Sequence, residues 1–218
     1  MKITLEQVKN DKAVRSYIQK ADESLIALGY TEHSFAHVGK VADTASHILK
    51  TLGYSEREAE LAAIAGYLHD IGNVINRIDH AQSGAVMAFR ILDRMEADPE
   101  DVATVITAIG NHDESTAFPV NAVAAALILA DKTDVRRSRV RNQDLSNFDI
   151  HDRVNYSVTD AKIQVSKEEI CLDLQIETKL CTVMDYFEIF LNRMLLCKRS
   201  AEKLGTKFAL IINGQKMI

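Results

Sequence analysis

The spacing of apolar residues changes once along this chain, and that change constrains the fold most. Up to about Asn142, apolar side chains recur at helical spacing, and beyond it they alternate with polar neighbours. Only two prolines and nine glycines interrupt 218 residues, and most of them mark the ends of helical stretches. We therefore predict a mainly α protein, with a helical bundle over residues 1–142 and a small α+β appendage over residues 143–218.

Six helices are expected in the first part, each delimited by a capping residue, a glycine or a proline. The first two are expected at Leu5–Leu28 and Ser34–Leu52, and the third begins at the capping box Ser55-x-x-Glu58 and ends near His69. The fourth is capped by Asp79 and carries Ala81–Leu92. The fifth runs from Asp98-Pro99 toward His112, and the sixth follows Pro119 and ends near Arg136. In the appendage, alternation predicts a β-hairpin with a turn at Ser166–Glu169, followed by a helix and a last strand. These elements are expected at Val154–Val165, Ile170–Ile176, Val183–Gly205 and Phe208–Ile212.

Charge, apolar runs and cysteines exclude several classes of protein. The 26 basic against 31 acidic residues, a net charge of −5, disfavour a protein held to nucleic acid or anionic lipid by overall charge. No signal peptide is expected, and the longest apolar stretch, Val120–Ala130, is too short to span a membrane. The three cysteines show no metal-binding or disulfide spacing. We expect a cytoplasmic protein with reduced thiols and no membrane association.

Several histidines and aspartates stand where the apolar periodicity does not require them. They are His37, the pair His69-Asp70, His80, the pair His112-Asp113, and Asp131 directly after a wholly apolar run. Buried charge is costly unless it is paired, and a divalent cation would supply the missing positive charge. Histidine and carboxylate ligands without cysteine fit one or two ions of Mn²⁺, Fe²⁺, Co²⁺, Ni²⁺, Zn²⁺ or Mg²⁺, with coordination positions left for water and substrate.

The order of these residues resembles the signature of the HD-domain superfamily of metal-dependent phosphohydrolases. His37 is followed by Lys40 and Val41, then come His69-Asp70 and Asp131, and the resemblance extends over about Thr31–Asn142. It implies an all-helical HD fold. It also implies that His37, His69, Asp70 and Asp131 bind one divalent metal ion.

His80 and His112 resemble the additional histidines of HD members that hold two metals. On this resemblance, Asp70 bridges both ions while His80 and His112 bind the second. Asp113 stands where the branch that cleaves cyclic di-GMP has a second histidine, and residues 114–120 lack that branch's Gly-Tyr-Pro stretch, so cyclic di-GMP is not the expected substrate. Asp113 itself is equally consistent with a ligand, a residue that orients a histidine, or a surface acid.

The resemblance implies hydrolysis of a phosphomonoester or phosphodiester, such as a nucleotide, by a metal-activated water. Asp70, His80 and His112 are the expected catalytic residues; with a single ion, the two histidines would bind the phosphate or protonate the leaving oxygen. Lys132 and Arg136, one helical turn apart, are candidates to hold the substrate phosphate, although a solvated helix end explains most of the basic run. Nucleic acid is disfavoured as a partner because aromatic residues do not alternate with the basic ones.

Other interpretations remain open at this stage. His33 shares a helix face with His37 and is expected at the pocket rim or at the helix start, while His47 and His151 are expected in solvent. The apolar face of Val183–Leu196 fits either core packing or a homodimer. Two other function classes compete with a phosphohydrolase acting on a small phosphorylated substrate: a di-iron oxygenase with an HD fold, and a signalling protein whose appendage is the functional part.

Overall fold

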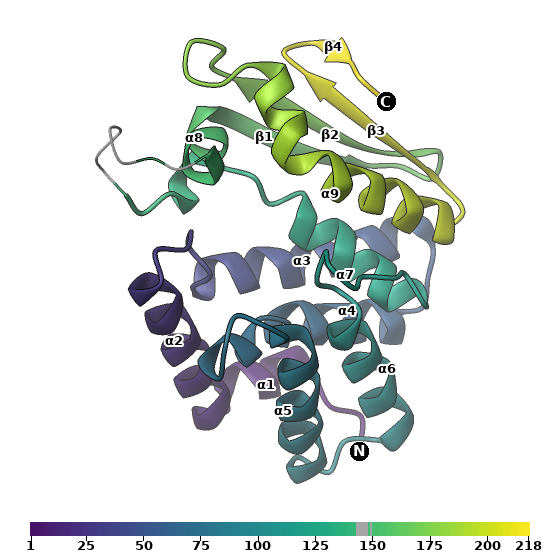
Figure 1. Ribbon diagram of the computed structural model, residues 1–218. Helices are drawn as coiled ribbons and strands as arrows, with labels where there is room; N and C mark the ends of the chain where they lie inside the picture. Colours follow the sequence, from purple (N-terminus) through teal and green to yellow (C-terminus); the bar gives the residue numbers. More distant parts are fainter. Residues whose placement is uncertain (143–147, 149) are drawn as a thin grey trace.

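The computed structural model describes residues 1–142, 148 and 150–218. Helices make up most of the described chain (Figure 1). They are α1 (Leu5–Asn10), α2 (Lys12–Ala27), α3 (Phe35–Leu52), α4 (Glu56–Leu68), α5 (His80–Arg94), α6 (Pro99–Gly110), α7 (Ala122–Lys132), α8 (Ile150–Ser157) and α9 (Val183–Lys203), with short 3-10 helices η1 (Ile71–Val74) and η2 (Arg137–Arg139). Among these described helices, none combines the length and apolar character that a bilayer span requires.

A small sheet occupies the C-terminal part of the chain. Its strands are β1 (Val158–Val165), β2 (Glu169–Ile176), β3 (Lys207–Ile212) and β4 (Gln215–Lys216), in the order β1-β2-β3-β4. The β1/β2 and β3/β4 pairs are antiparallel, whereas β2 and β3 are parallel and are connected through α9. In Figure 1, α9 runs between this sheet and α7. The predicted fold class, a mainly helical bundle with a C-terminal α+β extension, is confirmed.

Three local predictions need correction. The expected helix over Leu5–Leu28 is two helices, because Asp11 has extended backbone angles and its carboxylate caps α2 by accepting from the amides of Ala13 and Val14. Residues 150–157 form α8 instead of the start of a strand, and β1 begins only at Val158. Asp79 does precede α5, but its backbone is left-handed (φ 57°) and its side chain makes no capping hydrogen bond.

Helix α7 lies in the middle of the protein, and its position explains its composition. Its residues from Val123 to Ala130 are all buried, and it packs against α3, α4, α6 and α9. An apolar surface on every side is what a helix surrounded by other helices requires. One continuous apolar core runs from Ile3 to Ile212 and so includes α9 and the sheet. The division into domains at residues 142 and 143 stays a prediction.

The close approach of α3 and α4 depends on small residues. A Cβ atom added at Gly66 of α4 would lie 2.9 Å from the backbone Cα and N of Ala42 in α3. Glycine therefore lets the two backbones touch. This contact brings the start of α3, which carries His37, beside the end of α4, which precedes His69 and Asp70.

Candidate metal centre

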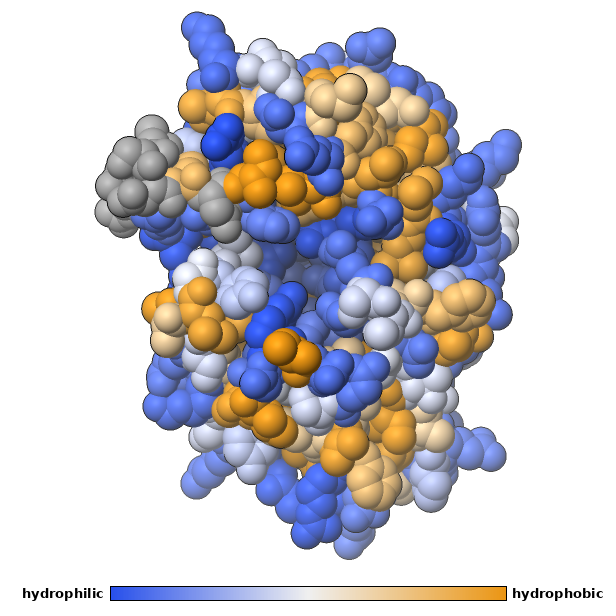
Figure 2. Space-filling model, in the orientation of Figure 1, coloured by the Kyte–Doolittle hydropathy of each residue, from blue (hydrophilic) through white to orange (hydrophobic). Residues whose placement is uncertain are grey.

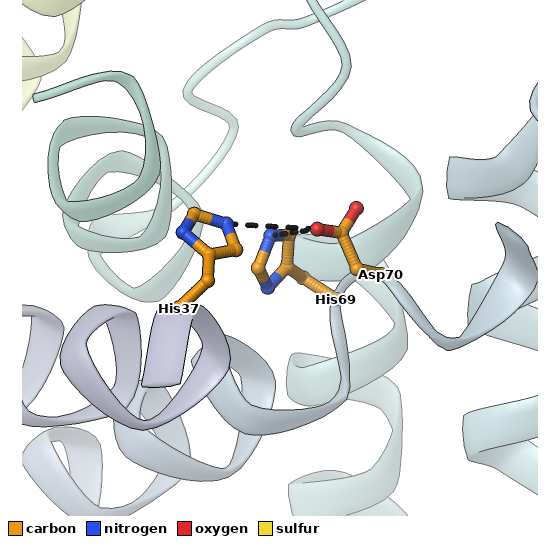
Figure 3. Close-up of side chains that lie close together, drawn as sticks. All are labelled: His37, His69 and Asp70. Carbon is orange, nitrogen blue, oxygen red and sulfur yellow. Dashed lines mark ion pairs between the residues drawn. The ribbon is translucent and has the colours of Figure 1, made fainter. Parts of the chain in front are cut away.

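The six predicted ligands come together because each lies at or near a helix end. His37 is in the first turn of α3, His69 and Asp70 directly follow α4, His80 begins α5, His112 follows α6, and Asp131 is in the last turn of α7. Their side-chain atoms form groups that could hold a metal ion: His37/His69/Asp70, His69/His112/Asp131 and Asp70/His80/His112. Figure 3 shows the first group, with both imidazoles turned toward the Asp70 carboxylate.

The first group contains polar atoms that no protein group satisfies. Asp70 Oδ2 lies 3.1 Å from His69 Nε2 and 3.6 Å from His37 Nε2, the ion pairs drawn in Figure 3. Within the described part of the chain, these three buried atoms lack a hydrogen-bond partner. Buried polar atoms without partners are rare and costly. A cation among them would supply the interaction that they lack, so the residues fit a divalent metal.

The orientation of the four histidines also suits a metal. Each one directs Nδ1 at an oxygen acceptor: His37 at Asp134 Oδ2 (2.8 Å), His69 at the Gly66 carbonyl (2.8 Å), His80 at the Arg77 carbonyl (3.1 Å) and His112 at the Ile109 carbonyl (2.6 Å). Because these oxygens accept, Nδ1 carries the proton of the neutral ring. In that neutral form each Nε2 lone pair can bind a metal. His80 Nε2 also lies 3.4 Å from Arg77 Nη1, a donor that a cation bound there would have to replace.

The group of Asp70, His80 and His112 shows the consequence most directly. His80 Nε2 lies 3.3 Å from His112 Nε2, and neither nitrogen donates when both rings are protonated at Nδ1. Two lone pairs at this distance attract a cation between them, because cis ligands about 2.1 Å from a metal are separated by about 3 Å. Asp70 Oδ1 lies 3.6 Å from His80 Nε2 and 4.0 Å from His112 Nε2. Asp70 thus presents one oxygen to each pair of histidines.

One family model matches the part of the chain that carries these residues. Residues 34–188 match the HD domain family, and the match includes all six candidate ligands. The chain belongs to the HD domain family. An uncharacterized protein of Methanocaldococcus jannaschii, MJ1020, is 25% identical to it over 211 residues, which cover 86% of this chain and 80% of that protein. A crystal structure from an uncultured Thermotogales bacterium, described as a predicted HD superfamily hydrolase, is 26% identical in sequence. The match covers 57% of this chain and 68% of the Thermotogales chain, with a TM-score of 0.46.

Most protonation states in this HD domain protein are those that a metal requires. The exception is His69: burial opposes its ionisation, but the neighbouring Asp70 and Asp131 carboxylates raise its pKa, so a bound cation would take the place of a proton there. Burial opposes ionisation of Asp70 and Asp131, but His69 beside the first and Lys132 beside the second hold the pKa of each carboxyl well below its usual value. Burial lowers the pKa of His112 to about 3, and it also lowers the pKa of His80. At neutral pH the two carboxylates are therefore charged while His80 and His112 are neutral.

Asp134 supports the site and was not recognised in the sequence. Its carboxylate is fully buried, accepts the Nδ1 proton of His37, and pairs with Lys40 Nζ (2.7 Å) and Arg136 Nε (3.0 Å). Burial opposes ionisation, but the hydrogen bond from His37 and the neighbouring cations hold its pKa far below the usual value. The available signal was a second acid three residues after Asp131, beyond the end of an apolar helix.

We expect Asp134→Asn to weaken metal binding about 10- to 100-fold, because it removes the negative charge that orients His37 and makes it a stronger ligand. Titration of the variant with metal against a competing chelator measures the effect. Asp43→Asn, an exposed acid on the same helix as His37, is the matched control and should bind metal as the wild type does. Unchanged affinity in a folded Asp134→Asn variant would show that Asp134 does not tune the site.

A cavity of about 360 Å³ opens onto Asp70, His80, His112 and Asp131. Figure 2 shows a recess surrounded by hydrophilic residues in the middle of this face. The chain after α2 forms one wall of the cavity, with Tyr30, Thr31 and His33. The opposite wall comes from the C-terminal segment, defined here as residues 150–218, through His151, Asp152 and Asn155 of α8 and Phe190 and Arg193 of α9. The cavity size is typical of a site for a small molecule.

The two predicted phosphate-binding residues lie in different places. Lys132 lines the cavity, and its Nζ lies 2.7 Å from Asp131 Oδ2. Arg136 does not line it, because α7 ends at Lys132 and the chain is no longer helical one turn later. The Arg136 guanidinium instead pairs with Asp134 and with Glu32 Oε2 (2.9 Å). The prediction for Arg136 extrapolated helical spacing past the end of the helix.

The remaining histidines and Asp113 are placed as follows. His33 lines the cavity with Nδ1 2.7 Å from the Thr31 carbonyl, His151 is exposed at the cavity wall, and His47 is exposed on α3 outside it. Asp113 lines the cavity, accepts a hydrogen bond from Ser115, and places Oδ1 4.0 Å from His80 Nε2, beyond hydrogen-bond distance.

Proposed function

We propose that this HD domain protein is a metal-dependent phosphohydrolase that cleaves a phosphomonoester or phosphodiester of a small molecule. The observation that carries the proposal is a set of buried ligand atoms, on His37, His69 and Asp70, that have no hydrogen-bond partner among the described residues and lie beside a cavity with basic side chains. Such atoms call for a cation, and basic side chains around a cation favour an anionic substrate. Membership in the HD domain family agrees with this choice.

The residues divide into two ligand sets on this proposal. His37, His69, Asp70 and Asp131 would hold one divalent cation, and His80 and His112 would hold a second one together with Asp70. Nitrogen and oxygen donors without cysteine fit Mn²⁺, Fe²⁺, Co²⁺, Ni²⁺, Zn²⁺ or Mg²⁺. When bound, such cations lower the pKa of a water molecule and offset the charge of phosphoryl oxygens.

The protein groups around the ligands position the substrate. Lys132 places a buried ammonium group at the cavity, where it attracts a phosphoryl oxygen. If only one cation is bound, His80 and His112, which both line the cavity, become candidates to bind the phosphate or to protonate the leaving oxygen. Their Nε2 atoms lie 3.3 Å apart, and that of His80 also lies 3.4 Å from Arg77 Nη1. In both cases Asp70 stays a ligand.

A metal analysis combined with a substrate screen tests the proposal. The protein is purified without oxygen, its metal content per chain is measured, and phosphate release is assayed over nucleotides and sugar phosphates. We expect one or two divalent ions per chain and phosphate release that EDTA abolishes and added divalent cation restores. Bound iron with oxygen consumption, and no phosphate release with any cation, would contradict the proposal and favour the di-iron oxygenase.

A further inference from the structure

The cavity contains an arginine that has no carboxylate within ion-pair distance among the residues described by the structure. The lysine and arginine side chains that line it are Arg77, Lys132, Arg139 and Arg193. Lys132 pairs with Asp131 (2.7 Å) and Arg193 with Glu114 (2.6 Å). Arg139 is buried and donates to the backbone carbonyls of Glu32 and Asp134. Among the residues that the structure describes, Arg77 alone of these four has neither a carboxylate partner nor such a pair of backbone acceptors.

Neutral groups hold Arg77 beside the candidate ligands. Its Nη1 lies 3.2 Å from Asn73 Oδ1 and 3.4 Å from His80 Nε2, and its Cζ lies 5.5 Å from the centre of the Tyr30 ring. The Asn73 amide in turn donates to Asp70 Oδ1 (3.0 Å). The guanidinium is thus fixed at the His80 side of the site. Its contacts leave most of its five N–H donors and all of its charge available.

We propose that Arg77 is the residue that anchors the phosphate group of the substrate, through two N–H donors directed at phosphoryl oxygens. This inference rests on the proposed function. The planar guanidinium matches the geometry of a phosphate, and an uncompensated cation in a partly enclosed cavity favours a dianionic group. A phosphate bound at His80 and Asp70 lies within reach of Arg77, whereas Arg136 is directed away from the cavity by Asp134 and Glu32.

Binding of inorganic phosphate to the metal-loaded protein tests this role independently of turnover. Calorimetry compares the wild type with Arg77→Gln, with Arg77→Lys, and with the control Arg90→Gln, which removes an exposed arginine from α5 outside the cavity. We expect Arg77→Gln to bind phosphate about 10- to 100-fold more weakly, the range for a hydrogen bond to a charged group. Arg77→Lys should recover part of the affinity, and Arg90→Gln should match the wild type.

Metal content separates phosphate anchoring from a structural role. All variants are analysed for bound metal per chain and for melting temperature. We expect both quantities to stay at wild-type values in Arg77→Gln. Equal phosphate affinity in the wild type and Arg77→Gln, or weaker phosphate binding only together with lost metal, overturns the role of Arg77 while leaving the proposed function in place. A metal-loaded wild type that neither binds phosphate nor releases it from any ester overturns the proposed function itself.

Discussion

Asp70→Ala is expected to remove bound metal and hydrolytic activity together. Asp70 directs Oδ2 at His37 and His69 and Oδ1 at His80 and His112, so its loss affects both candidate metal positions. The substitution also leaves His37 and His69 without the carboxylate that their Nε2 atoms face. We expect metal per chain to fall below half of the wild-type value and kcat/KM to fall by about a thousandfold or more, which corresponds to about 4 kcal/mol of transition-state stabilisation.

The matched control for this variant is Asp93→Ala. Asp93 is an exposed acid on α5 that pairs with Arg90, and its removal changes the net charge by the same amount. Elemental analysis and the phosphate-release assay should give wild-type values for the control. An Asp70→Ala protein that keeps its metal and its activity would contradict the assignment of Asp70 as the shared ligand.

Gly72→Ala is expected to disrupt both the fold and the site. A Cβ atom at this position of η1 would lie 2.0 Å from the carbonyl oxygen of His80 and 2.6 Å from the amide nitrogen of Gly84. Both contacts are with backbone of α5, which cannot rotate away as a side chain would. Insertion of the methyl group must therefore separate η1 from α5 and move Asp70 away from His80.

The expected cost exceeds the range of about 1 to 3 kcal/mol that is common for overpacking, because the clash is with backbone. A loss of about 3 kcal/mol or more lowers the melting temperature by about 6 to 12 °C in a chain of this size, and metal binding should weaken with it. Gly39→Ala is the control: it lies within α3, and an added Cβ meets nothing within 4 Å. That variant should be as stable as the wild type or more so. A Gly72→Ala protein with wild-type melting temperature and metal content would contradict the backbone contact.

Helix positions could be predicted from the sequence where local chemistry determines them. The capping box of Ser55 and Glu58 and the Asp98-Pro99 start are present as expected, because both depend on residues within one turn. The prediction was wrong at residues 154–157, which form the end of α8 instead of a strand. Apolar residues that alternate along a strand recur every second position, so every second one of them is also four residues away, which is helical spacing. Val154 and Val158 therefore fit a helix as well as a strand, and packing of α8 against η2 and α9 decides the outcome.

Part of the candidate site could also be predicted, because some of its residues form an ordered pattern in the sequence. The order of His37, His69-Asp70 and Asp131 is visible along the chain, and the structure brings these residues together, although their role as ligands stays a prediction. Asp134 and Arg77 could not be identified because their relevance depends on contacts made only after folding. Asp134 meets a histidine 97 residues earlier, and Arg77 is distinguished by the absence of an acid beside it among the described residues.

The candidate metal ligands and one wall of the cavity come from different parts of the chain. Every candidate metal ligand comes from residues 37–131, whereas Asn155, Phe190 and Arg193 face the same cavity from the C-terminal segment. On the proposed function, substitutions in that segment would reshape the space for the rest of the substrate without changing any candidate ligand atom. During evolution, selectivity can therefore diverge among related proteins while the reaction is retained, and a library designed to alter substrate preference can be confined to α8 and α9.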